Sequence, residues 1–481
     1  MRTGGLRTLA TAFAVLLAAC QATPPSNAIV FEGARLIDGS GCASIEDSAF
    51  IVENDHFTWA GRRADVQPPP GAAHVDLRGK TVMPTLTDLH GHIGFQNIAE
   101  GTMSKQMYTR ENLVDHLELL AYNGVGAVIG VGDLVSRSDL HGGRTNWGDV
   151  PLRVRDEVVP GAALFRTAGP GVAWPGSGAQ GDPSRVDVSY PITTVDEARA
   201  AVRDYAAMKP VFIKIWVDDR GGTKKTLTPE LYRAVADEAH KYNLPVGVHN
   251  VTLANAKELM RAGVEGWLHV PVRGGEAADD ELIAIVKDRI ARNDRPKMWM
   301  TPSLITQWMN TQGGGGRPDW LDDPLLQAAY SPADIERHWG GPLQKMTAQD
   351  VAAARKSFEE DARNAMRLRA AGMTIVNGTD TGQTRFWVGY FNHLDLQSMV
   401  AMGMTPMETI VAATRDSAAV AQINTGTVAA GKNADFIVLD ANPLDDISNT
   451  RKINKVFLRG KEVDRAALRA RWLAHRKRST S

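Results

Sequence analysis

The chain has 481 residues, of which 43% are hydrophobic and 23% charged, and its formal net charge is −1 at pH 7. This is an ordinary globular composition, long enough for one large domain and a smaller one. The near-zero charge gives no reason to expect a nucleic acid or an anionic membrane surface as a partner. After the N-terminus, no segment approaches the roughly 18 continuous apolar residues of a membrane span.

The first 20 residues, MRTGGLRTLATAFAVLLAAC, have the layout of an export signal. Arginines precede an apolar stretch over residues 9–17, and small residues precede Cys20. The ending resembles a bacterial lipobox, which implies cleavage before Cys20 and a lipid on its thiol; the alternative is a plain signal peptide. We therefore expect a lipoprotein signal peptide at 1–19, a tether at 20–27, and anchoring at the periplasmic face of the cell envelope, at the outer membrane.

Cys42 is the cysteine that remains after such a cleavage. A single cysteine in an exported protein argues against a disulfide framework. We therefore expect Cys42 to be buried as a small apolar residue.

Short apolar runs separated by turns predict β-strands at both ends of the mature chain. Residues 28–84 contain such runs, with turns at Asn54–Asp55 and Arg78–Gly79. The same pattern of short apolar runs and turns recurs at 421–465, so the two pieces are expected to pack together as one small β-sandwich. The remaining segment, 466–481, is expected to form a basic helix or tail.

Between these pieces, residues 85–420 alternate between strand-like and helical patterns. Eight apolar strand-like segments occur in this order: TDLHGH, GVGAVIGVGD, AALFRTAGP, VFIKIWVDD, LPVGVHN, GVEGWLHVP, KMWMTPSL and MTIVNGTD. A helix or a long loop follows each one, and Thr228 is a predicted N-cap. The count predicts an α/β fold, a (β/α)8 TIM barrel with its active site at the C-terminal strand ends. A doubly wound sheet competes, but no glycine-rich phosphate loop follows the first strand.

Candidate metal ligands stand at the C-terminal ends of these strands. His90 and His92 are two residues apart in an extended segment, so both imidazoles project from one face. His249 ends the fifth strand, the sixth carries His269, and the eighth ends in Asp380. Imidazole and carboxylate are the ligands of zinc and its first-row neighbours. If the barrel is correct, these groups converge at its mouth and predict a metal site.

Each of these residues has an ordinary structural explanation when taken alone. His249 or His269 could be a hydrogen-bonded core histidine, and Asp380 could cap the next helix. Their joint placement favours a metal site, because independent accidents would all have to fall at the same ends of successive strands.

Four other histidines are assigned outside this site. His116 and His240 lie in helical patterns and are expected at the surface. His56 and His74 belong to the predicted sandwich.

Lys214 interrupts the fourth strand, PVFIKIWVDD, which otherwise reads as buried. A buried, unpaired ammonium is costly, so such a lysine must lower its pKa, find a counter-charge, or be chemically changed. An internal ion pair is the ordinary alternative. Its strand face is shared with Phe212 and Trp216.

The chain resembles the amidohydrolase superfamily over essentially its whole mature length. The segment MPTLTDLHGH matches the family's opening signature, with Thr85 where glycine is usual and Thr87 in an apolar position, while Asp-x-His-x-His is intact. The closing segment, from MTPMETIVAATRDSAAV to NTGTVAAGKNADFIVLDANPLDDI, is also similar to that family. A lysine on strand four is typical of its branch with two metals, which includes prolidase-like and imidazolonepropionase-like enzymes.

This resemblance implies a binuclear centre and a mechanism. The implied metal ligands are His90, His92, Lys214, His249, His269 and Asp380. Lys214 would be an N6-carboxylysine that bridges two divalent ions, with zinc as the expected metal, together with a hydroxide. Asp380 is the implied catalytic residue, which accepts the proton of that nucleophile and delivers it to the leaving nitrogen.

The implied activity is hydrolysis of amide, peptide or carbamate-type C–N bonds in a small molecule. An N-acyl amino acid or dipeptide with an aromatic or hydrophobic side chain is the substrate class to test first. Hydrolysis of esters, lactones or phosphotriesters is the alternative, since the same metal pair can perform it. A non-catalytic surface binding protein is less favoured, because every ligand position is filled. A homo-oligomer is compatible with the sequence.

Long loops after strands three and seven are rich in glycine and tryptophan, and on a barrel they would overhang the mouth. Tryptophans there could line a side-chain pocket, and an arginine could bind a substrate carboxylate. The residues available after strands are Trp147, Trp174, Trp308, Trp320, Trp339, Trp387, Arg144, Arg317 and Arg385. For each one, ordinary packing or a solvated loop is the competing interpretation.

Overall fold

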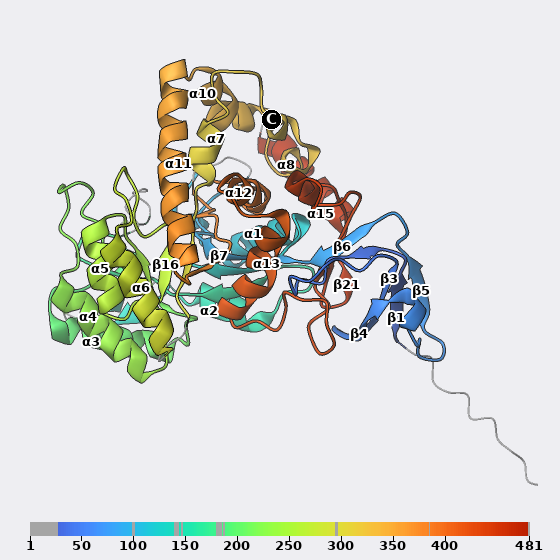
Figure 1. The fold of residues 1–481 in the computed structure, drawn as a ribbon, viewed down its shortest axis with the longest axis horizontal. Helices are drawn as coiled ribbons and strands as arrows, with labels where there is room; N and C mark the ends of the chain where they lie inside the picture. Colours follow the sequence, from blue (N-terminus) through green and yellow to red (C-terminus); the bar gives the residue numbers. More distant parts are fainter. Residues whose placement is uncertain are drawn as a thin grey trace, which may run out of the picture.

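The protein is described here by a computed structural model that covers residues 27–98, 102–138, 144–145, 148–178, 185, 188–293, 297–383 and 385–479. The predicted signal peptide, Cys20 and Trp147 lie outside the described residues. The chain forms a mixed α/β body, a β-rich lobe and a helical projection (Figure 1).

The β-rich lobe contains two sheets whose strands come from both ends of the chain. One sheet has the order β4-β3-β1-β5 and the other β2-β6-β19-β20-β21. The strands of the lobe are β1 (Ile29–Glu32), β2 (Arg35–Leu36), β3 (Ser48–Glu53), β4 (His56–Arg62), β5 (Ala73–Asp76), β6 (Thr81–Pro84), β19 (Phe436–Leu439), β20 (Ile453–Leu458) and β21 (Lys461–Glu462). The antiparallel pairing of β6 with β19 joins the two ends of the chain.

A cluster of phenylalanines fills the space between these two sheets. Phe31 stacks on Phe50 with ring centroids 5.0 Å apart, and Phe436 stacks on Phe457 at 4.5 Å. Phe31 also meets Phe436 edge to face at 5.1 Å, which links one sheet to the other. Burying these large rings holds the two terminal segments of the chain together.

The α/β body contains all eight strand segments expected from the sequence. They are β7 (Leu86–Gly91), β8 (Val125–Gly130), β11 (Leu164–Thr167), β14 (Ile213–Trp216), β15 (Val246–His249), β16 (Gly266–Leu268), β17 (Trp299–Thr301) and β18 (Thr374–Ile375). They lie in two parallel sheets, β11-β8-β7 and β13-β12-β14-β15-β16-β17-β18. The second sheet begins with two short strands of the loop after β11, β12 (Val172–Ala173) and β13 (Tyr190–Pro191).

Backbone hydrogen bonds also run between the two parallel sheets. The N–H of Val211, just before β14, donates to the carbonyl of Thr167 at 3.0 Å. At the other side, the N–H of His92 donates to Thr381 at 2.7 Å, and that of Leu89 to Asn377 at 3.1 Å. The first expected strand therefore neighbours the segment of the eighth.

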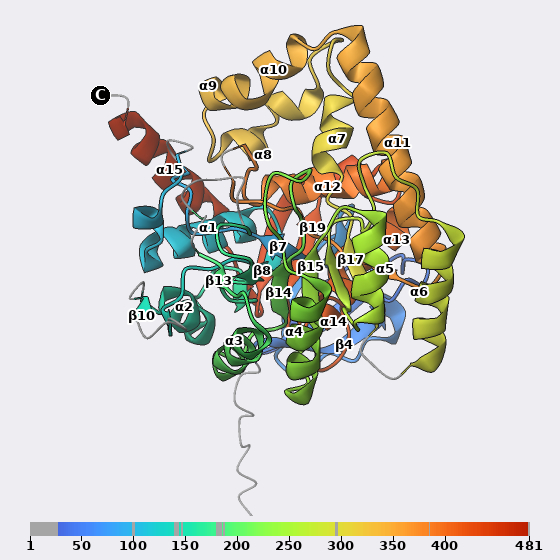
Figure 2. The same ribbon diagram turned by 90° about the vertical axis from the view of Figure 1, so that its left-hand side faces the viewer.

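Helices cover the outside of these strands (Figure 2). They include α1 (Arg110–Tyr122), α2 (Val150–Glu157), α3 (Val195–Ala207), α4 (Pro229–Lys241), α5 (Leu253–Arg261) and α6 (Asp280–Arg292). Thr228 caps α4 as expected, because its side chain accepts a hydrogen bond from the N–H of Leu231. One face of α4, which includes Leu231, Val235 and Ala239, is buried.

A long helical excursion separates β17 from β18 and forms the projection in Figure 1. It comprises α7 (Ile305–Asn310), α8 (Pro324–Gln327), α9 (Pro332–Ile335), α10 (Gly341–Gln344) and the long α11 (Ala348–Ala370). The chain continues after β18 through α12 (Tyr390–Ala401), α13 (Pro406–Val411) and α14 (Ser417–Val420), and α15 (Arg465–Ser479) follows β21. Two-residue strands β9 (Arg137–Ser138) and β10 (Arg144–Thr145) complete the elements.

Two expectations about burial are wrong. Cys42 is exposed rather than buried, because it lies in the turn-rich segment between β2 and β3. His116 is fully buried rather than at the surface. It accepts a hydrogen bond from the N–H of Gly94 at 2.8 Å, and its other ring nitrogen lies 2.9 Å from the carbonyl of Gln96.

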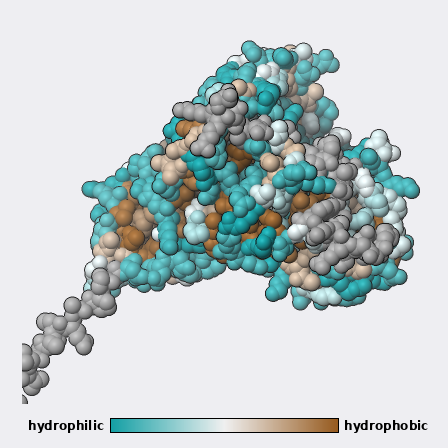
Figure 3. All heavy atoms as spheres, turned by 180° about the vertical axis from the view of Figure 1, so that it is seen from behind, coloured by the Kyte–Doolittle hydropathy of each residue, from teal (hydrophilic) through white to brown (hydrophobic). Residues whose placement is uncertain are grey.

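On the face shown in Figure 3, hydrophilic residues surround separate patches of hydrophobic residues. Among the described residues, the exposed large hydrophobic side chains are Val158, Tyr242 and Leu473. Within the same residues, no helix combines the length and the apolar character that crossing a bilayer requires.

Candidate metal centre

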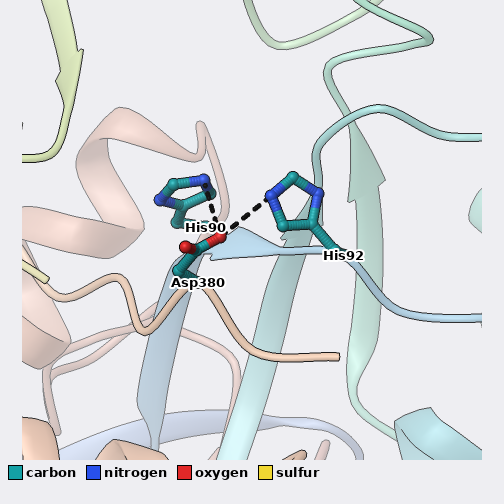
Figure 4. A group of neighbouring side chains, drawn as sticks. All are labelled: His90, His92 and Asp380. Carbon is teal, nitrogen blue, oxygen red and sulfur yellow. Dashed lines mark ion pairs between the residues drawn. The ribbon is translucent and has the colours of Figure 1, made fainter. Parts of the chain in front are cut away.

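His90, His92 and Asp380 meet at the C-terminal ends of the first and eighth strands (Figure 4). His90 lies in β7, His92 follows it, and Asp380 follows β18. One carboxylate oxygen of Asp380, Oδ1, lies 2.9 Å from Nε2 of His92 and 3.4 Å from Nε2 of His90. One ligand atom from each residue lies within 4.8 Å of the others, which suits a single cation.

The electrostatics of this trio suit a metal ion. Burial lowers the pKa of both His90 and His92, so both imidazoles are neutral near pH 7. Burial alone would raise the pKa of Asp380, but His90 and His92 more than offset it and hold that pKa below the usual range. Neutral imidazoles beside an ionised carboxylate form a donor set for zinc-like ions.

His269 and His249 extend this trio into a continuous row of rings. The ring of His269 lies 5.0 Å from that of His90, and the ring of His249 lies 4.9 Å from that of His269. Burial is the main reason that the pKa of His249 falls to about 4 and that of His269 well below its ordinary value. All four imidazoles are therefore neutral. We call the group formed by His90, His92, His249, His269, Asp380 and Lys214 the cup.

Lys214 lies in β14 and is 1% exposed. Its Nζ has no hydrogen-bond partner and sits 5.0 Å from the centre of the Trp216 ring. Burial drives its pKa well below the ordinary value, partly opposed by Asp380. Burial therefore favours the neutral amine, which reduces the cost of burying Lys214.

The backbone is strained at the strand ends that form the cup. His269 has a φ of 125°, Ser303 of 50° and Asp380 of 58°, a region that residues other than glycine rarely adopt. Such strain persists where the surrounding structure fixes it, and it gathers at functional sites. Close packing is also enforced at Gly378, where a Cβ atom would lie 2.4 Å from Thr301 and 3.0 Å from His90.

Hydrogen bonds to the far side of the rings orient two of the four histidines. Nδ1 of His92 bonds the carbonyl of Val131, and Nε2 of His249 lies 3.0 Å from Oδ2 of Asp218. The Nδ1 atoms of His90 and His269 have no hydrogen-bond partner. The buried Nζ of Lys214, which has no partner among the described residues, fits a centre that is completed by metal ions.

Asp88 forms hydrogen bonds that fix the backbone around His90 and Asp380. Its Oδ1 accepts hydrogen bonds from the N–H groups of His90 at 3.0 Å and Thr379 at 3.2 Å. Its Oδ2 accepts from Oγ1 of Thr379 at 2.6 Å and from Nδ2 of Asn392, on α12, at 3.2 Å. A single carboxylate thus ties the strand of His90 to the residue before Asp380.

Sequence reasoning missed Asp218 and Arg273. Asp218 comes two residues after β14, where a carboxylate reads as an ordinary loop residue. Arg273 follows His269 by four positions, is largely buried, and its Nε has no hydrogen-bond partner. Its positive charge adds to the lowering of the pKa of His269 and His249.

The loop residues named from the sequence lie mostly outside the cup. Trp320, Trp339 and Trp387 are fully buried in the packing of the helical excursion and its neighbours. Arg317 pairs with Asp322 and Glu336.

Three more of these residues have partners that are clear from the structure. The guanidinium of Arg385 lies over the Trp339 ring. Trp308 packs partly buried against the main core, as does Trp174, whose ring also faces Lys225 at 5.4 Å. The side chain of Arg144 lies outside the described part.

Comparisons with known proteins agree with this fold. A model of the Amidohydrolase family matches residues 324–463. The chain is 24% identical to an ochratoxinase of Aspergillus niger, over 90% of this chain and 84% of that protein. It is 22% identical to an imidazolonepropionase of Streptomyces coelicolor, over 86% of this chain and 90% of that protein. A solved Xaa-Pro dipeptidase with methionine bound in its active site has a TM-score of 0.67 at 20% identity, covering 90% of this chain and 99% of that one.

The fold and these matches show that the chain has the architecture of the amidohydrolases. The chain is similar in sequence and fold to proteins of the amidohydrolase superfamily.

Proposed function

We propose that the protein is a metal-dependent hydrolase that cleaves amide, peptide or carbamate-type bonds in a small molecule with an activated water. The observation that carries this proposal is the gathering of the four imidazoles, Asp380 and Lys214 in one cup. These residues come from five strands, and no packing requirement explains why so many polar groups should be buried together.

Two divalent cations, with zinc as the expected metal, fit this donor set. His90, His92 and Asp380 would hold one cation, and His249 and His269 the other. Lys214 would join the two as its carbamate: the neutral Nζ attacks the carbon of CO2 and loses a proton, which leaves a carboxylate at the end of the side chain. The low pKa of Lys214 supports this step, because only the neutral amine is nucleophilic.

When bound, such a pair supplies an acidified water at neutral pH and a Lewis acid for the scissile carbonyl. The protein's own contribution is proton transfer and orientation. An oxygen of the Asp380 carboxylate takes the proton of the attacking water and delivers it to the leaving nitrogen. His90 and His92 support this role, since they keep Asp380 ionised and fix its position.

We propose an N-acyl amino acid or a dipeptide as the substrate class, with Arg273 as the partner of the substrate carboxylate. The charge of Arg273 lowers the pKa of both His249 and His269, and its Nε has no hydrogen-bond partner among the described residues. A guanidinium in that setting suits a carboxylate. The similar Xaa-Pro dipeptidase, whose active site binds an amino acid, is consistent with this class.

We also propose that the eight strands close into a (β/α)8 barrel and that the β-rich lobe is a separate small domain. The hydrogen bonds from Val211 to Thr167 and from His92 to Thr381 support closure at both seams. The proposed boundaries are 28–84 with 421–465 for the lobe and 85–420 for the barrel.

The function is tested by metal analysis and a substrate screen. Elemental analysis of the purified protein is expected to find close to two divalent ions per chain. Parallel assays of N-acyl amino acids, dipeptides and aryl esters are expected to show turnover of the amides. Turnover of esters or phosphotriesters alone would overturn the amide assignment, and a protein that binds no metal would overturn the mechanism.

Export and lipid anchoring at Cys20 are proposed from the sequence alone. Metabolic labelling with a fatty acid tests this, because the native chain is expected to carry the label and Cys20→Ala to lose it. Equal labelling of both proteins would exclude Cys20 as the attachment site.

A further inference from the structure

We propose that Asp218 is a positioning residue for the metal centre, which orients His249 as a ligand through Nδ1, and that Arg220 holds Asp218 in place. This inference rests on the proposed function, since it assumes that His249 binds a cation. Neither residue is itself an expected ligand.

The contact between Asp218 and His249 is buried and direct. Asp218 is 8% exposed, and its Oδ2 lies 3.0 Å from Nε2 of His249. Because an ionised carboxylate only accepts hydrogen bonds, the proton of the neutral imidazole must lie on Nε2. The lone pair of Nδ1 is then left for a cation.

The strands bring the two residues together across 31 positions of sequence. Trp216 of β14 pairs with His249 of β15 in parallel register. The N–H of Val217 then donates to the carbonyl of His249 at 2.9 Å. The next residue, Asp218, is thereby held beside the histidine ring.

Arg220 fixes both oxygens of the carboxylate. Its backbone N–H donates to Oδ1 of Asp218 at 2.9 Å, a short turn within the loop. Its Nη1 lies 3.1 Å from Oδ2, the same oxygen that faces His249. The guanidinium thus offsets the buried charge, while the backbone bond keeps the carboxylate oriented.

His249 differs in this respect from the other three histidines. His92 is held at its far nitrogen by a carbonyl, and the Nδ1 atoms of His90 and His269 have no partner. Among the described residues, His249 is the one of these four histidines that has a carboxylate partner other than an expected ligand. Such a partner fixes the tautomer and raises the basicity of the ring, and its loss typically costs about 10- to 100-fold in metal affinity.

Asparagine cannot replace Asp218 even though it has the same shape. If its oxygen faces His249, its NH2 group meets the N–H of Arg220, and two donors oppose each other. If the amide is flipped, the NH2 group faces Nε2 and favours the tautomer with the proton on Nδ1, which blocks that atom as a ligand. Either arrangement weakens the site at His249.

The test compares Asp218→Asn and Asp218→Ala with Asp219→Asn as the matched control. Asp219 is the adjacent exposed carboxylate, and its Oδ1 accepts only a local bond from the N–H of Gly221. Zinc affinity is measured for each protein by competition with a chromophoric chelator. The visible spectrum of the Co²⁺-substituted protein reports the ligand geometry.

Both Asp218 variants are expected to bind the weaker of two zinc ions about 10- to 100-fold less tightly and to show an altered Co²⁺ spectrum. Asp219→Asn is expected to match the wild type. If both Asp218 variants match the wild type, the inference is wrong, although the proposed function stands when the wild type binds two zinc ions. If the wild type binds none, the proposed function itself fails. Circular dichroism identifies a misfolded variant, and the isosteric Asp218→Asn carries the test if Asp218→Ala does not fold.

Discussion

The two halves of the cup are built differently. His90, His92 and Asp380 already contact one another, with an ionised carboxylate 2.9 Å from one imidazole. His249 and His269 lie ring to ring at 4.9 Å, and the nearby Lys214 Nζ has no partner. The first half contains the carboxylate of Asp380, whereas the metal-binding group found among the described residues includes no carboxylate beside His249 and His269.

This difference indicates how such a centre can be assembled. The first half is a complete ligand set as folded, so it can bind a cation without further chemistry. The second half needs an anion that no unmodified side chain described there supplies. Carboxylation of Lys214 would provide it. We therefore expect the two halves to respond differently to substitution.

The largest effect is expected for Lys214→Ala, which removes the proposed bridge. It should release the cation of the second half and reduce turnover by more than the roughly 100-fold that loss of an outer partner costs. The first half should keep its cation, so elemental analysis should find about one ion per chain. Short-chain carboxylates such as formate should restore part of the activity, because they can occupy the place of the bridge.

Full activity in Lys214→Ala would show that the two halves do not depend on a bridge. Lys257→Ala is a suitable control for loss of a lysine, because Lys257 pairs with Asp279 and Glu281 on the outer helices.

Asp380→Asn tests the role of the carboxylate in the first half. The change keeps the shape but removes the charge and the proton-accepting oxygen. Turnover should fall by about 10²- to 10⁴-fold, the usual contribution of a general acid–base group. Steady-state kinetics at saturating substrate measure this loss, and wild-type turnover would exclude Asp380 as the proton carrier.

Asp88→Asn tests the difference between the two halves further. Asp88 is not an expected metal ligand, so the change acts on the first half only through its hydrogen bonds. Its NH2 group would oppose either the N–H groups of His90 and Thr379 or the donor of Asn392. Zinc affinity of the first half should fall by about 10- to 100-fold. Chelator competition measures this, and an effect confined to the second half would contradict the proposed division.

The smallest effect concerns a buried histidine outside the cup. His393, on α12, bonds Thr450 and the carbonyl of Asn123, and burial lowers its pKa to about 3. Because its folded pKa is below its unfolded value, the unfolded state binds more protons below pH 6.5, and stability falls as pH decreases toward 3. The loss should be about 2 kcal/mol between pH 7 and pH 5.

Chemical denaturation at several pH values measures this dependence. The metal-free protein is used because release of bound metal at low pH would also change the stability. His393→Gln should flatten the profile in that window. An unchanged slope would mean that His393 does not contribute to acid destabilisation.

The sequence by itself determined the alternation of elements and the polar ends of the strands. The eight apolar segments, the cap at Thr228 and the positions of His90, His92, His249, His269 and Asp380 follow from local patterns. Such patterns are readable because the period of a strand or helix decides which side chains share a face.

Only the tertiary structure decided which residues support the cup. Asp218 reaches His249 through the pairing of two strands, and Arg273 comes near that half through the path of a loop. The burial of His116, the exposure of Cys42 and the packing of the tryptophans in the helical excursion were likewise set by long-range contacts. Local periodicity carries no information on such contacts, because they depend on how distant segments pack.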